Sequence, residues 1–87
     1  MPTSTTRVAI PTGVYTAVTD GNFNVFIRPV TPVALRLHIG QTLPAAATTD
    51  FMPLSSASVS FSDLEGTDKV YLMAEGEGAE VVVIKGG

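Results

Sequence analysis

The segment Val33-Ala34-Leu35-Arg36-Leu37-His38-Ile39-Gly40 decides the fold, because its apolar and polar side chains alternate with a period of two. This alternation is typical of a β-strand with one buried and one solvated face, and the buried set would be Val33, Leu35, Leu37 and Ile39. An Ala/Thr/Pro-rich crossing follows and ends at Phe51-Met52-Pro53-Leu54. Since Pro53 cannot donate a ladder hydrogen bond, we expect this last segment to form an edge strand.

Short segments of the same type, separated by turn residues, make up the rest of the chain. A strong Asp20-Gly21-Asn22 turn signal predicts that residues 14–19 and 23–28 pair as a hairpin. No segment has the period of an amphipathic helix. The sequence therefore predicts an all-β fold, a small antiparallel β-sandwich or jelly-roll-like barrel of about seven or eight strands. We expect residues 1–6 to form a flexible N-terminal arm and residues 7–87 to form a single domain.

The composition suggests more apolar surface than one small domain can hide. Of the 87 residues 45% are hydrophobic and only 15% are charged, whereas about 25% charged residues is typical. A chain of this length buries only roughly 60% of the surface that its unfolded form exposes. We therefore expect association with another chain, most simply as a homo-oligomer.

Charge, hydropathy and cysteine content argue against a nucleic-acid-binding protein, a membrane protein and a protein stabilised by disulfides or thiolate-bound metal. The net charge is −3 with no cluster of basic residues, so nucleic acid is not an expected partner. No apolar run approaches the roughly 18 residues of a membrane span, so no membrane partner is expected. Cysteine is absent, which rules out disulfides and thiolate metal sites and favours an intracellular origin.

The residues that could carry catalysis are few. His38 is the only histidine, so neither a zinc site nor nucleophilic catalysis has its usual partners. Gly76 and Gly78 lack the third glycine of a dinucleotide-binding loop. Glu75, Glu77 and Glu80 could supply an acid/base pair, but they surround a turn and have no other polar partner nearby in the sequence.

An acidic turn at Asp63, Glu65 and Asp68 invites a calcium site, but its spacing differs from that of an EF-hand and a solvated turn explains it. We therefore expect no metal, no cofactor and no enzymatic activity.

Some large apolar side chains lie on the strand parity opposite the expected core. If each sheet had a solvated outer face, these side chains would form an exposed patch, and such patches mark interaction sites. A covering loop, or a shift of one residue in register, would bury them instead. The predicted interface residues are Phe26, Tyr71, Met73, Val82 and Ile84.

The order of segments from about residue 33 to 86 resembles small virion structural proteins of tailed bacteriophages. The segments that carry the resemblance are Leu35-Arg36-Leu37-His38-Ile39-Gly40, a short Ala/Pro/Thr spacer, Phe51 before Pro53-Leu54, a serine-rich strand, Lys69-Val70-Tyr71-Leu72-Met73-Ala74-Glu75 and Val81-Val82-Val83-Ile84. They form a pattern of β-hairpins and not a catalytic signature.

This resemblance implies a non-enzymatic module of the phage particle, made in the host cytoplasm. A capsid decoration or cement protein is expected, which would oligomerise and bind the major capsid protein or another virion protein of the head shell. The alternative is a glycan- or host-surface-binding module of a tail or head fibre. Its candidate contacts are Tyr15, Tyr71, Asn22 and Asn24, although the chain has no tryptophan to stack on a sugar.

Overall fold

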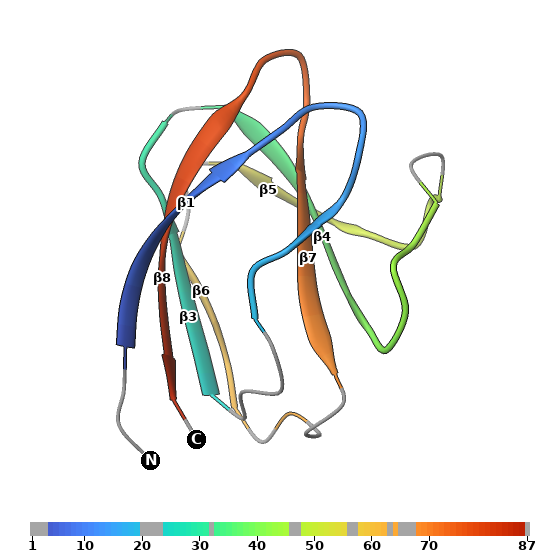
Figure 1. Ribbon diagram of the computed structural model, residues 1–87. Helices are drawn as coiled ribbons and strands as arrows, with labels where there is room; N and C mark the ends of the chain where they lie inside the picture. Colours follow the sequence, from blue (N-terminus) through green and yellow to red (C-terminus); the bar gives the residue numbers. More distant parts are fainter. Residues whose placement is uncertain are drawn as a thin grey trace.

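The computed structural model describes residues 4–19, 24–31, 33–45, 48–55, 58–62, 64 and 68–86. Within these ranges the chain forms eight strands and no helix (Figure 1). The strands are β1 (Ser4–Ile10), β2 (Thr16–Ala17), β3 (Asn24–Pro29), β4 (Ala34–Gly40), β5 (Met52–Ser55), β6 (Val59–Phe61), β7 (Lys69–Ala74) and β8 (Ala79–Gly86).

The strands form two four-stranded sheets that face each other. Sheet A has the order β1-β8-β3-β6, and sheet B has the order β2-β7-β4-β5. The strand ladders are all antiparallel, and β1 pairs with β8, β2 with β7, β3 with β6 and β4 with β5. This pairing is that of a two-stranded ribbon rolled up into a jelly roll. The predicted all-β sandwich is confirmed.

The core lies between the sheets and follows the predicted alternation. Leu35 and Leu37 of β4 are buried and stand opposite Ala74 and Leu72 of β7. Sheet A contributes alternate residues of β3 and β8 to the same core. The buried cluster comprises Ile10, Val18, Val25, Ile27, Val33, Leu35, Leu37, Leu54, Val70, Leu72, Ala74, Ala79, Val81 and Val83.

The predicted hairpin of residues 14–19 with 23–28 is wrong. β2 pairs with β7 in sheet B, whereas β3 pairs with β6 and β8 in sheet A. Val18 and Val25 belong to the same core cluster, so the two segments meet across the sandwich and not side by side. The turn residues 20–22 lie outside the described residues. A local turn signal cannot distinguish a hairpin from a crossing between sheets.

The predicted N-terminal arm of residues 1–6 is too long. β1 begins at Ser4, and Ser4, Thr5 and Thr6 pair with Lys85, Ile84 and Val83. These residues lie at a sheet edge with exposed side chains, so their sequence has no apolar alternation although the backbone is paired. Residues 1–3 lie outside the described residues.

Candidate interaction surface

The outer face of sheet A carries an apolar strip, which we call the outer stripe, formed by Phe26, Val82 and Ile84. Phe26 stands directly opposite Ile84, and Val82 lies one step further along β8 on the same face. Phe26 is 38% exposed, and Val82 and Ile84 are half-buried. The alternate residues Val81 and Val83 are fully buried in the core. These three residues of the predicted interface therefore share one solvent-facing surface.

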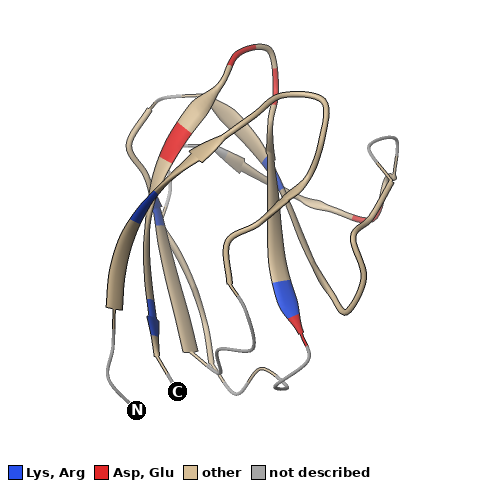
Figure 2. Cartoon of the chain, in the orientation of Figure 1, with Lys and Arg blue, Asp and Glu red and all other residues tan. Residues whose placement is uncertain are grey.

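Charged side chains frame the outer stripe. Arg7 and Arg28 flank Val82 from the neighbouring strands β1 and β3. The Nη1 group of Arg7 donates a hydrogen bond to Oε1 of Glu80 over 2.8 Å. Figure 2 shows basic and acidic segments close together where β1, β3 and β8 run side by side. An apolar centre with a charged, solvent-accessible rim is the usual composition of a protein interaction surface.

The prediction that Tyr71 and Met73 are exposed interface residues is wrong. Both lie on the outer face of sheet B, but they are only 4% and 5% exposed because they pack with Tyr15 in a second buried cluster. After β1 the chain crosses to sheet B, where the amide of Ala74 donates to the carbonyl of Pro11. Tyr15 belongs to this crossing segment and covers Tyr71 and Met73.

Arg36 and His38 border this second cluster on β4. The His38 ring lies 6.3 Å from the Tyr15 ring and 6.2 Å from the Tyr71 ring, measured between centroids. Its Nδ1 is 2.6 Å from the carbonyl oxygen of Asp50, so Nδ1 carries a proton and donates it. His38 therefore tethers the β4–β5 loop, and no carboxylate partner contacts it among the described residues.

The Arg36 guanidinium joins three parts of the sheet B surface. It stacks 4.6 Å from the centroid of the Phe51 ring, while its Nε and Nη2 approach Oε1 of Glu75 at 3.1 and 3.0 Å. A cation over an aromatic face and a paired carboxylate are both stabilising. Arg36 therefore links the strand to the β4–β5 loop and to the end of β7, through the Phe51 ring and through its Nε and Nη2 groups.

The hydroxyl of Tyr15 is buried and has no hydrogen-bond partner among the described residues. An unpaired buried hydroxyl costs about 1–3 kcal/mol, because it gives up hydrogen bonds to water without replacement. Burial raises the pKa of Tyr15 above its ordinary value of 10.0, an effect that the charge of Arg36 opposes and that of Glu75 reinforces. The Tyr15 ring stabilises the sheet B face, whereas its hydroxyl group does not.

We therefore expect Tyr15→Phe to increase the free energy of unfolding by about 1 kcal/mol, since it removes the unpaired hydroxyl and keeps the ring. Urea denaturation followed by circular dichroism measures the change. Tyr15→Leu serves as the control, because loss of the ring should destabilise the protein. A less stable Tyr15→Phe protein would contradict this account by revealing a partner for the hydroxyl.

The same residue predicts a pH dependence. Below pH 10 the folded and unfolded states both hold the phenol proton of Tyr15. In that range the contribution of Tyr15 to the free energy of unfolding therefore does not change with pH. Above pH 10 the unfolded state releases this proton first, and the free energy of unfolding then falls as the pH rises. We expect the advantage of Tyr15→Phe over the native protein to be larger at about pH 11 than at about pH 8. An unchanged difference would mean that the Tyr15 pKa is the same in both states.

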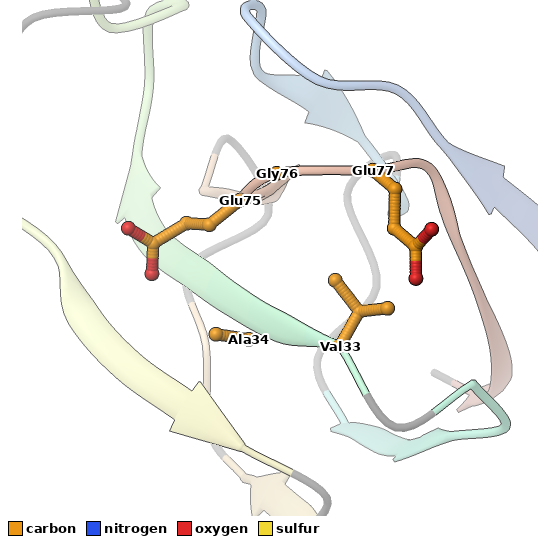
Figure 3. A pocket seen from close by; sticks show the side chains of 5 residues that line it. All are labelled: Val33, Ala34, Glu75, Gly76 and Glu77. Atoms are coloured by element: carbon orange, nitrogen blue, oxygen red, sulfur yellow. The ribbon is translucent and has the colours of Figure 1, made fainter.

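A shallow cavity of about 420 Å³ lies between the β7–β8 turn and the start of β4. Val33, Ala34, Glu75, Gly76 and Glu77 line it. In Figure 3 the carboxylates of Glu75 and Glu77 point in different directions. Glu75 is bound to Arg36, and Glu80 is bound to Arg7 on sheet A. The three glutamates considered as an acid/base group are thus not brought together.

No cluster of three metal-ligating side chains occurs in the part of the chain that the structure describes. Of the acidic turn, Asp63 and Glu65 lie outside that part. The same residues include no helix that is long and apolar enough to cross a membrane. In comparisons with known proteins, no family model, curated protein or solved structure matches this chain.

Proposed function

We propose that this protein is a non-enzymatic structural component of a tailed-bacteriophage virion, a capsid decoration or cement protein that self-associates and binds the head shell. The proposal combines the resemblance of residues 33–86 to small virion proteins with the character of the molecular surface. Its partners would be further copies of this chain and the major capsid protein or another virion protein.

The observation that carries the proposal is the difference between the two outer faces. On sheet B the large apolar side chains Tyr71 and Met73 are covered by Tyr15 from the same chain. On sheet A none of the residues that the structure describes covers the outer stripe in this way, and Phe26 is 38% exposed. A jelly roll closes its core between two sheets and leaves their outer faces available. The uncovered face of sheet A is therefore the surface that we assign to shell binding.

The fold and the size of the molecule support the same proposal. Jelly rolls occur in viral capsid proteins as well as in lectins and cupins, so the topology is compatible with the function but does not determine it. A face of four strands with three to eight residues each offers a small contact area, well suited to a component present in many copies. When many small interfaces act on one lattice, their combined affinity exceeds that of any single contact.

The test is co-sedimentation of the purified protein with purified heads of the phage that encodes it. We expect the protein to move with the heads and to saturate at a fixed number of copies per shell. Recovery only in the unbound fraction, with shells that lack bound copies of the protein, would overturn the proposal. Heads already saturated with the protein serve as the control for nonspecific trapping.

The residues that the structure describes do not form the surface that the glycan-binding alternative needs. Sugar sites need aromatic rings that are open to solvent, but Tyr15 and Tyr71 are 5% and 4% exposed and pack against each other. Asn24 is exposed on β3, and Asn22 lies outside the described residues. The exposed aromatic ring of Phe26 belongs to the apolar stripe. We therefore keep the structural function as the proposal.

A further inference from the structure

We infer that the edge of sheet A formed by β1 is the seam through which two copies of this chain pair, strand to strand, across a two-fold axis. The inference deepens the proposed function and rests on it for the expectation that copies associate. It differs from that proposal in naming a backbone edge, and not the outer stripe, as the contact between copies.

The four edge strands of the sandwich are not equally open. β2 has two residues and β6 has three, while β5 has four residues and contains Pro53. Natural sheets protect their edges with short strands and prolines of this kind. β1, by contrast, has seven residues and no proline until Pro11, after its end. It is therefore the one long, regular edge among the described strands.

The exposed half of β1 is Ser4–Arg7, whose four side chains are all exposed. β8 pairs with one side of this segment, and no other strand of the described ranges lies beside the backbone groups that point away from β8. Such groups are ready to pair with an added strand. The other half is less accessible, since Val8 is half-buried and Ile10 is fully buried in the core.

A second copy of β1 fits this edge by its own sequence. In an antiparallel pair centred on Thr6, each Arg7 would lie opposite Thr5 of the other copy, and each Ser4 opposite Val8. A pair centred on Thr5 would place the two copies of Thr5 opposite each other and each Ser4 opposite Thr6. Neither register brings Arg7 opposite Arg7, and threonine pairs across strands are favourable. The segment is thus self-complementary, as a two-fold interface requires.

Pairing at this seam would also unite the two outer stripes. The two-fold axis of an antiparallel strand pair is perpendicular to the sheet, so both outer faces would point in the same direction. Thr5 of β1 lies beside Ile84 on that face, and Ile84 lies beside Phe26. The dimer would therefore present two stripes on one continuous sheet, and both could contact the shell at once with a gain in avidity.

Disulfide trapping tests the seam directly, because the chain has no cysteine of its own. The variants Ser4→Cys, Thr5→Cys and Thr6→Cys each place one thiol on β1. We expect rapid formation of a covalent dimer at the position nearest to the two-fold axis. Ser60→Cys is the matched control, since Ser60 is an exposed residue of β6 at the opposite edge of sheet A and should not cross-link.

A charge variant supplies a second, independent measurement. Thr5→Lys and Thr6→Lys would bring like charges together across the seam, so we expect the dimer dissociation constant to rise at least tenfold, with Ser60→Lys unchanged. Light scattering over a dilution series measures it. A protein that is monomeric at every concentration overturns the inference. So does a dimer whose dissociation constant is unchanged by these lysines and which forms no disulfide through β1. A monomer that still binds heads would overturn the inference and leave the shell-binding part of the proposed function standing.

Discussion

Replacing Leu35 with alanine is expected to reduce the free energy of unfolding by about 2–5 kcal/mol. Leu35 is fully buried on β4 and is paired on one side with Leu54 of β5 and on the other with Ala74 of β7. The lost side chain leaves a cavity that neighbouring strands, held in register by their ladders, cannot fill. Because small domains are stable by only about 5–15 kcal/mol, this one change should remove much of the total.

Leu43→Ala is the matched control for this prediction. It removes the same atoms from a residue that is 64% exposed in the β4–β5 loop. Its effect should stay within about 0.5 kcal/mol, as for most surface substitutions. Urea denaturation of both variants provides the comparison. Equal effects at the two positions would contradict the assignment of Leu35 to the core.

The second large effect is expected at Phe26, where Phe26→Asp should weaken binding to phage heads at least tenfold. An aromatic residue at the centre of an interface commonly contributes 2 kcal/mol or more, which corresponds to about 30-fold in affinity. The aspartate would in addition place an unpaired charge against the shell. Because Phe26 lies on the outer face, the variant should still fold, and its thermal unfolding checks this.

Two further variants make this result specific. Leu43→Asp introduces the same charge at an exposed apolar residue of the β4–β5 loop and should leave head binding unchanged. Val82→Thr keeps the shape of a half-buried residue of the outer stripe and should weaken binding to a smaller extent. If Phe26→Asp binds heads as well as the native protein does, the outer stripe is not the shell-binding surface.

The sequence predicts the strands well because their side chains alternate. Leu35 and Leu37 lie in the core as their parity requires. The alternation of apolar and polar side chains indicates which face of a strand packs against the core. This pattern can be read from residues that are adjacent in the sequence. The fold class followed from these local patterns.

The sequence could not predict which strands pair with each other or which segment covers the outer face of a sheet, because both depend on contacts between distant parts of the chain. β2 and β3 follow each other in sequence yet belong to different sheets, a result of long-range packing that the turn between them does not encode. Tyr71 and Met73 lie on the outward parity as predicted, but Tyr15 buries them from a distant part of the chain. The one sign of this in the sequence was Pro11, which ends a strand shortly before Tyr15 and so indicates that the chain leaves its sheet there.

The most direct test of the account is hydroxyl-radical footprinting of the protein, free and bound to heads. Phe26 on sheet A and Met52 on sheet B are 38% and 42% exposed, so both should react in the free protein. We expect head binding to protect Phe26 and to leave Met52 reactive. Protection of Met52 with an unchanged Phe26 would contradict this assignment, because shell binding would then use the β5 edge of sheet B.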